Sequence, residues 1–314
     1  MSFNATVRDE LARALDEKEP PRRAELAALI RLGGTIGGGS AGRYRIELST
    51  ENAAVARKVI TLAHTIFGLK TEFTPRKNTL HKANNYLITL PSQRGLKNVL
   101  DQFGLMGGAH PTWGIAEGII QDDACAASYL RGAFLASGFI ADPKGDFHFE
   151  ISMHSEDLAQ DIKRLMGRFD IDAKIVARRN AWTVYLKGTD SIIDFLALVG
   201  AHNALLKTEE VRVFKSMRNA VNRQVNAEVA NQAKATDAAL KQIACIDLIE
   251  AKRGIDSLPR ALKEFAQLRR AHPESSLREL GEMAKPPLSK SAVNHRVRRL
   301  EEVAESLKNK SVRS

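Results

Sequence analysis

The sequence predicts an α+β fold built on a duplicated domain, joined by a long helix to a small all-α helix-turn-helix domain. Two observations indicate this. An internal repeat relates Leu26 to Leu130, and the last third of the chain holds a long stretch without proline or glycine, followed by short capped helices. The expected boundaries are an N-terminal segment at 1–20, the duplicated domain at 21–208 with halves at about 21–110 and 120–208, a connecting helix at 209–254, and a domain at 255–314 whose helix-turn-helix covers about 275–308.

The repeat consists of the same order of elements in both halves. Each half opens with a helix, at Leu26-Ala-Ala-Leu-Ile-Arg-Leu-Gly-Gly and at Leu130-Arg-Gly-Ala-Phe-Leu-Ala-Ser-Gly. Alternating apolar residues then predict a strand, a 3.6-residue apolar period predicts a helix, and a second strand and a closing helix follow. The paired segments are 44–49 and 148–152, 55–66 and 158–169, 85–90 and 181–186, and 96–103 and 192–199.

The two opening helices share a stripe of small residues, which indicates that they pack against each other with their backbones close. The stripe holds Ala27, Ala28 and Gly33 in the first helix and Gly132, Ala133, Ala136 and Ser137 in the second. A helix that merely tolerates glycine is the alternative, and the fixed offset favours pairing. Each helix stops at a glycine, Gly34 or Gly138, which predicts a left-handed cap.

The positive charge of the chain is concentrated in its last third. The protein has 314 residues and a net charge of +10. Residues 1–206 hold 25 basic and 23 acidic side chains, whereas residues 207–314 hold 22 and 14. A basic tail can serve solubility alone, but here the charge coincides with a helix-turn-helix pattern, so we expect this part to bind the phosphates of double-stranded DNA.

Separate residue signals mark the start and end of each helix in the helix-turn-helix pattern. Ser276 and Glu279 form a capping box before a short helix, in which Leu277, Leu280, Met283 and Ala284 are expected to face the core of the domain. Pro286 and Pro287 end that helix. Ser289 or Ser291 is expected to cap the next one, whose inward stripe is Val293, Val297, Leu300 and Val303.

The outward residues of this last helix are the candidate DNA contacts. Asn294 suits bidentate pairing with adenine and Arg298 with guanine, while Arg296, Arg299 and Lys285 suit phosphates. His295 fits a contact role and a plain surface role equally. The full candidate set is Lys285, Ser289, Lys290, Ser291, Asn294, His295, Arg296, Arg298 and Arg299.

The connecting helix carries an unusual group of polar residues, Asn222, Arg223, Asn226 and Asn231. Asn222 and Asn226 share a face, because residues four apart lie on the same side of a helix. They either hydrogen-bond to the neighbouring domain or form a solvated face. Gly254 is expected to mark the end of the helix.

Several other site types find no support in the sequence. Cys125 and Cys245 stand alone in apolar surroundings, which predicts buried packing and no disulfide or zinc site. The run Gly33-Gly-Thr-Ile-Gly-Gly-Gly-Ser-Ala-Gly lacks the ending of a nucleotide-binding loop, and a flexible connection is the simpler expectation. We expect no cofactor, no metal and no small-molecule substrate. No signal peptide or membrane helix is evident, which predicts a cytoplasmic, nucleoid-associated protein.

The segment from Leu130 to Gly138 resembles the LAGLIDADG signature of homing endonucleases, and the segment from Leu26 to Gly34 resembles a degraded copy. In that family, two such helices pack at a pseudo-dyad, and an acidic residue before the last glycine of each holds the catalytic metals. The matching positions here are Gly33 and Ser137, neither of which carries charge. The resemblance therefore implies no catalytic residues and no metal-dependent cleavage.

Nearly the whole chain resembles the WhiA-type bacterial regulators, which join a catalytically inactive LAGLIDADG-like domain to a C-terminal helix-turn-helix. The second LAGLIDADG copy, the asparagine-rich helix from Arg218 and the run from Pro286 to Leu300 carry the match, whereas Ala227 stands where the family often has cysteine. The resemblance implies sequence-specific DNA binding, sporulation-type transcription regulation, and roles in cell division and chromosome segregation. In actinobacterial members it also implies cooperation with a WhiB-type iron–sulfur protein. The alternatives are a nucleoid-associated scaffold and, with less support, an active nuclease.

Overall fold

The computed structural model describes residues 2–39, 43–77, 84–107 and 110–310. It divides into two compact units, Met1–Lys215 (unit 1) and Ser216–Ser314 (unit 2), and helix α8 (His202–Arg253) has residues in both. No helix in these ranges has both the length and the apolar character needed to cross a membrane.

Unit 1 contains the predicted repeat, and its two halves have the same sheet topology. A first helix, α1 (Phe3–Arg13), precedes the repeat. Two four-stranded antiparallel sheets have the orders β1-β2-β4-β3 and β7-β8-β10-β9. The first half consists of α2 (Glu19–Gly33), β1 (Gly34–Gly39), β2 (Arg43–Thr50), α3 (Ala53–Phe67), β3 (Glu72–Lys77), β4 (Asn84–Leu90) and α4 (Leu96–Gln102). The second consists of α5 (Asp123–Ser137), β7 (Gly138–Ile140), β8 (Phe149–Met153), α6 (Glu156–Gly167), β9 (Ala173–Arg178), β10 (Ala181–Leu186) and α7 (Thr189–Val199). Between the halves lie the short strands β5 (Met106–Gly107) and β6 (His110–Pro111) and a 3₁₀ turn, η2 (Glu117–Ile119).

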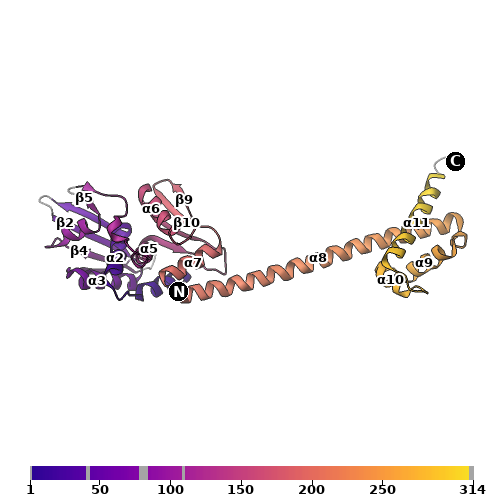
Figure 1. The fold of residues 1–314 in the computed structure, drawn as a ribbon, viewed down its shortest axis with the longest axis horizontal. Coiled ribbons are helices and arrows are strands. Elements are labelled where there is room, and N and C mark those ends of the chain that lie inside the picture. The colour runs from indigo at the N-terminus through magenta and orange to yellow at the C-terminus, as the bar shows by residue number, and fades with distance from the viewer. Residues whose placement is uncertain (1, 40–42, 78–83, 108–109, 311–314) are drawn as a thin grey trace. The chain divides into compact units, whose positions relative to one another are not determined.

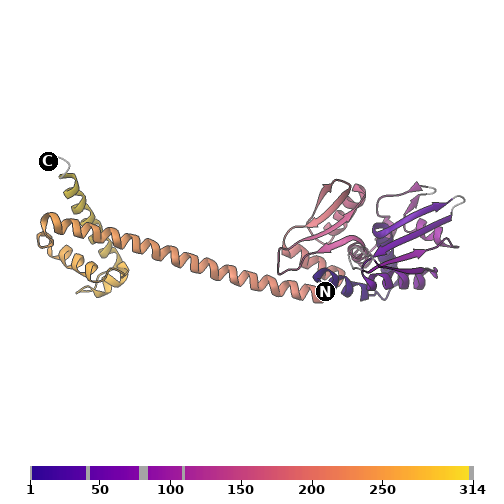
Figure 2. The same cartoon turned by 180° about the vertical axis from the view of Figure 1, so that it is seen from behind.

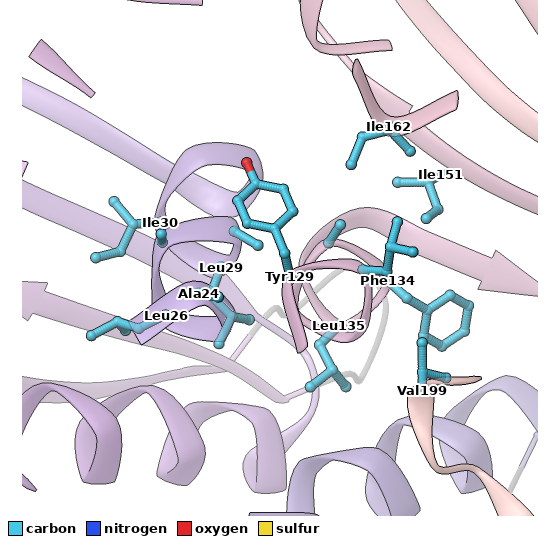
Figure 3. Packing of buried hydrophobic residues seen from close by; sticks show 14 of the residues in the cluster. Ala24, Leu26, Leu29, Ile30, Tyr129, Phe134, Leu135, Ile151, Ile162 and Val199 are labelled. Atoms are coloured by element: carbon cyan, nitrogen blue, oxygen red, sulfur yellow. The ribbon is translucent and has the colours of Figure 1, made fainter. Parts of the chain in front are cut away.

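Helices α2 and α5 pack side by side at the centre of unit 1, with one sheet on each side of the pair (Figures 1 and 2). The predicted pairing through small residues is confirmed, because a Cβ atom placed on Gly132 would lie 2.4 Å from the carbonyl oxygen of Glu25. On α5, Tyr129 lies on the side of α2, whereas Phe134 points away from it toward Ile151 and Val199 (Figure 3). The helix pair therefore separates two parts of a single apolar core.

The prediction of left-handed caps at the ends of α2 and α5 is wrong. Gly34 has a φ of −98° and Gly138 a φ of −78°, both in the extended region, and each begins a strand directly. Glycine is needed for a different reason. A Cβ at Gly34 would lie 2.5 Å from the carbonyl oxygen of Ile30, and a Cβ at Gly138 would lie 2.7 Å from that of Phe134. At both glycines the backbone turns so tightly from helix into strand that a side chain would collide with the last turn of the helix.

The expected flexible connection after Gly33 is also wrong over its described part. Gly34–Gly39 is strand β1, which pairs with β2 in a continuous antiparallel register from Gly34 opposite Leu48 to Gly39 opposite Arg43. Ladder hydrogen bonds hold this segment in place despite its many glycines, since they do not depend on side chains. Residues 40–42 of the same run lie outside the described residues.

Four charged side chains tie the first helices of unit 1 together. Glu25 of α2 is fully buried, and its Oε1 lies 2.5 Å from Nζ of Lys58 and 2.9 Å from Nε of Arg131. Lys58 also donates to the carbonyl oxygen of Leu11, and Arg131 also pairs with Asp16. Burial lowers the pKa of Lys58, with Glu25 opposing the shift. This buried network links α1, α2, α3 and α5.

Helix α8 begins at His202, seven residues before the expected start of the connecting helix. The carboxylate of Glu10 accepts hydrogen bonds from the backbone N–H groups of Asn203 and Ala204, at 2.7 and 3.1 Å. This cap comes from α1, far away in the sequence, so local patterns did not indicate it. Further along α8, residues 218–238 are exposed, as expected of the solvated alternative for Asn222 and its neighbours.

Unit 2 is all-α, with a small apolar core of its own. After α8 come a 3₁₀ turn, η3 (Ile255–Ser257), and helices α9 (Arg260–Ala271), α10 (Leu277–Met283) and α11 (Lys290–Lys310). Ile246 and Ile249 of α8 join Phe265, Leu280 and Leu300 in the core. Helix α8 ends before Gly254, as predicted, and this glycine has a φ of +78°, which side-chain-bearing residues rarely adopt.

Candidate nucleic-acid interface

Helix α10 begins with the predicted capping box. The backbone N–H of Glu279 donates to Oγ of Ser276 at 3.3 Å, and the N–H of Ser276 donates to Glu279 at 2.7 Å. The hydrogen bond that the carboxylate of Glu279 accepts from the backbone N–H of Ser276 lowers the pKa of this carboxyl. Two donors that a helix N-terminus leaves unpaired are thereby satisfied, which fixes where α10 starts.

The turn between α10 and α11 packs tightly onto α10 at Gly281. The backbone N–H of Leu288 donates to the carbonyl oxygen of Gly281 at 2.8 Å. A Cβ at Gly281 would lie 2.5 Å from the carbonyl oxygen of Leu288, so only glycine allows this approach. Sequence reasoning missed this residue, although an isolated glycine in a short helix signals close packing.

Helix α11 is oriented by the predicted inward stripe. Val293, Val297 and Leu300 are buried, and Val303 packs partly buried against the same core. Ser289 caps the helix, because its Oγ accepts the N–H of Ala292 at 3.2 Å. Its hydroxyl therefore has a structural role in addition to the contact role expected from the sequence.

The outward face of the first turns of α11 brings together the residues best suited to read bases. Lys290, Asn294 and Arg298 follow one another at intervals of four, so they lie along one face. Lys290, Ser291, His295 and Arg298 are exposed, and Asn294 is half-buried. The structure thus places amide, hydroxyl, imidazole and guanidinium groups on one side of a helix whose opposite side is core.

The expected phosphate contacts divide into different environments. Arg299 is exposed, and its Nη1 lies 2.8 Å from Oε2 of Glu302. Arg296 is half-buried and lines a cleft with Lys285 of the turn, together with residues of α9 and the end of α10. Because Arg296 is two positions from both Asn294 and Arg298, it lies about 200° around the helix from each. Arg296 and Lys285 therefore do not belong to the face that carries Asn294.

Two side chains of unit 2 differ from what the sequence suggested. Met283, expected in the core, is 43% exposed, because it is the last residue of the two-turn helix α10 and lines an open cleft. Arg269, which sequence reasoning did not single out, is buried. Its guanidinium donates to Oε1 of Gln242 at 2.9 Å and to the carbonyl oxygen of Ser275 at 2.6 Å. Burial lowers the pKa of Arg269. These bonds hold α9 against α8 and against the loop before α10.

The ends of α2 and α5 bring Gly33 and Ser137, the positions singled out from the sequence, to the seam of the two halves. A Cβ placed on Gly33 would lie 3.4 Å from Cβ of Ala136, the neighbour of Ser137. Asp122 caps the other end of α5 by accepting the N–H of Cys125 at 2.7 Å. Across the described ranges, no group of three or more His, Cys, Asp or Glu side chains is placed to hold a metal ion.

The two cysteines are free. Cys125 is buried, as predicted, and burial raises the pKa of its thiol to about 11. Cys245, which was also expected to be buried, is only half-buried, and desolvation raises the pKa of its thiol. Neither cysteine lies on the outward face of α11.

Three family models match successive parts of the chain. The WhiA N-terminal LAGLIDADG-like domain matches residues 20–106, the WhiA LAGLIDADG-like domain matches residues 126–218, and the WhiA C-terminal HTH domain matches residues 221–304.

Known proteins resemble the chain over nearly its full length. A protein named probable cell division protein WhiA from Desulforamulus reducens is 43% identical over 311 residues, which cover 98% of this chain and 97% of the relative. Its namesake from a Thermoanaerobacter species is 42% identical over 317 residues, covering 99% of this chain and all of the relative. The crystal structure of full-length DUF199/WhiA from Thermatoga maritima superposes with a TM-score of 0.60 at 25% identity and covers 98% of this chain and 99% of the other.

Proposed function

The chain belongs to the WhiA family, and from that membership and the exposed polar face of α11 we propose that it is a sequence-specific, non-enzymatic DNA-binding regulator. The observation that carries the proposal is the arrangement of unit 2. A capped helix, a tight turn and a second helix present Lys290, Asn294 and Arg298 on one face. A helix of this kind fits the major groove of double-stranded DNA.

We assign the contacts as follows. Asn294 and Arg298 read base edges, since their side chains match adenine and guanine in two-bonded geometry. Lys290, Ser291 and His295 supplement them near the start of α11, and Arg299 binds phosphate by exchanging its pairing with Glu302. The support is the common exposed face and the net positive charge of residues 207–314.

The absence of catalysis is part of the proposal. Phosphodiester cleavage by two metal ions needs oxygen ligands that hold the metals and orient water. Gly33 and Ser137 occupy the corresponding helix ends and supply no carboxylate. We further propose, from the names of the relatives, a role in cell division. The resemblance extends this to chromosome segregation, to sporulation-type transcription and, in some bacteria, to cooperation with a WhiB-type iron–sulfur protein on the nucleoid.

The test is an anisotropy titration of the full chain against a duplex obtained by rounds of selection from random sequence. We expect Asn294→Ala and Arg298→Ala each to weaken binding to the selected duplex by about 1–3 kcal/mol, with little effect on unselected duplex. Arg299→Ala should weaken binding to both duplexes alike.

Three results would count against the proposal. Unchanged affinity of both base-reading variants would refute the groove assignment. A failure of the selection to yield any preferred sequence would favour a scaffold that coats DNA. Magnesium-dependent cutting of the duplex, retained by the Arg298→Ala protein at saturating concentration, would favour a nuclease.

A further inference from the structure

A cleft on unit 2 lies apart from the face of α11 that carries Asn294 and Arg298. It has a volume of about 370 Å³ and is formed by α9, the end of α10, the following turn and α11. Its apolar lining includes Phe265, Leu268 and Met283. Because Arg296 is about 200° around α11 from Asn294 and from Arg298, DNA bound by those two residues contacts a different side of the helix.

The rim of the cleft is cationic. Arg260, Lys285 and Arg296 stand around it, with Glu264 as the one acidic lining residue. Glu264 is engaged by Arg260, whose Nε lies 2.9 Å from its Oε1. Within the described part of the chain, neither Lys285 nor Arg296 forms an ion pair. Two cations are thus available in a mainly polar lining, beside the apolar surface of Leu268 and Met283.

Apolar side chains cover a smaller part of the cleft, chiefly Leu268 and Met283, and this part distinguishes it from a simple phosphate contact. A DNA backbone offers charge and hydrogen-bond acceptors but no apolar group large enough to fill such a cleft. Met283 is 43% exposed at its edge, and Leu268 is only partly covered. Methionine and arginine are enriched where proteins bind one another, since a flexible thioether adapts to an apolar anchor and a guanidinium binds carboxylates.

We propose that this cleft is a docking site for an acidic segment of another protein, one that inserts an apolar side chain between Asp or Glu residues. The anchor packs on Leu268, Phe265 and Met283, and the carboxylates pair with Lys285 and Arg296. Unit 2 then holds DNA on one face of α11 and a protein partner on another. Binding of the acidic segment does not depend on the base contacts assigned above, whereas the separation of the two faces rests on that proposed function.

The experiment starts from random peptides displayed on phage and selected on the immobilised full-length protein. Selected sequences are synthesised with a fluorescent label and titrated by anisotropy. We expect Asp and Glu to flank a Leu, Met or Phe in the selected peptides. Replacing their carboxylates by amides should weaken binding about tenfold or more, because the complementary charges are lost.

Matched variants separate the cleft from the DNA face. Arg296→Glu and Met283→Ser should each weaken peptide binding about tenfold. Met283→Ser changes no charge and should leave affinity for duplex DNA within about twofold. Arg298→Glu should weaken binding to duplex DNA and leave binding to the peptide nearly unchanged. Met283 is exposed and Arg296 only half-buried, so we expect the variants to fold, which circular dichroism melting checks.

Three results would overturn the proposal. Selected peptides without acidic residues would contradict the chemistry of the rim. Equal losses of peptide binding in Arg296→Glu and Arg298→Glu would indicate unspecific charge attraction. A loss of DNA affinity in Arg296→Glu with unchanged peptide binding would assign the cleft to the duplex. Failure of Arg298→Ala to affect DNA would refute the base assignment alone.

Discussion

At the scale of single residues, the buried charges of unit 1 show how a polar group becomes part of the core. Glu25 is shared by Lys58 and Arg131, and each of the two cations has a second partner. Removing two charges from water is costly, and only complete pairing offsets that cost. The network is therefore expected to be sensitive to the loss of a single carboxylate.

We predict that Glu25→Gln lowers the free energy of unfolding by about 3–5 kcal/mol, because it leaves Lys58 buried with too little negative charge. Urea denaturation followed by circular dichroism measures the change. The matched control is Glu19→Gln, which removes the partner of Arg23 in an exposed pair and should cost no more than about 1 kcal/mol. Equal losses in the two variants would show that the network does not stabilise the core as described.

A second residue-scale prediction concerns Cys125 and pH. The ordinary pKa of the thiol is 9.0, whereas burial raises it to about 11 in the folded protein. At a pH between these two pKa values, the thiol of Cys125 has lost its proton in the unfolded chain but keeps it in the folded chain. The contribution of Cys125 to the free energy of unfolding is therefore fully present below pH 9 and is lost as the pH rises through 11.

Chemical denaturation from pH 8 to pH 11 tests this prediction. The free energy of unfolding of the wild-type protein should fall more steeply over that range than that of Cys125→Ala. Parallel curves for the two proteins would mean that the thiol ionises as easily in the folded state as in the unfolded one.

At the scale of elements, the central contact is the close approach of α2 and α5. Gly132 allows it, because no side chain fits between its Cα and the carbonyl oxygen of Glu25. We predict that Gly132→Ala pushes the helices apart and costs about 1–3 kcal/mol, despite the better helix propensity of alanine. Thermal and urea unfolding measure the loss.

Gly167 provides the control for that substitution. It also lies in a helix, the last turn of α6, but a Cβ there would meet no atom within 4 Å. Gly167→Ala should leave stability unchanged or raise it by up to about 1 kcal/mol. If Gly132→Ala were equally harmless, the pairing of α2 and α5 would be looser than the structure shows.

Most elements follow from local patterns, whereas their contacts over long sequence distances do not. The repeat, the capping box at Ser276 and the apolar stripe of α11 are periodic or short-range signals, and all three are confirmed. The cap of α8 by Glu10 joins residues about two hundred positions apart, which no local pattern records. The prediction of a left-handed cap at Gly34 was wrong because a glycine after a helix is typical both of such a cap and of a tight turn directly into a strand.

The sequence predicted that Arg296 and Arg299 lie further round α11 than Asn294, and the DNA contacts assigned to all these residues stay predictions. The spacing of Lys290, Asn294 and Arg298 placed them together correctly on α11. The sequence did not reveal that Lys285 and Arg296 line a cleft with α9, because that cleft is formed by residues of α9 and α11 that lie about thirty positions apart. Met283 was assigned to the core because helical spacing alone does not show where a two-turn helix ends relative to its neighbour.

At the scale of the whole molecule, the chain joins a nearly neutral repeat domain to a basic all-α domain. Residues 1–206 are almost balanced in charge, whereas residues 207–314 carry a clear positive excess. Attraction for a polyanion therefore belongs mainly to the second part, and high salt should weaken DNA binding through it. The repeat domain is built around the helix pair α2 and α5, with Gly33 and Ser137 at the helix ends.

Site-specific photo-crosslinking of the full chain to its selected duplex tests the central claim most directly. A benzophenone amino acid replaces Ser291 at the start of α11 or, as the comparison, Val176 on the exposed surface of β9. We predict a strong DNA adduct from position 291 and little or none from position 176. An adduct at 176 with none at 291 would contradict the account, because the duplex would then lie on the sheets of unit 1 and not on α11.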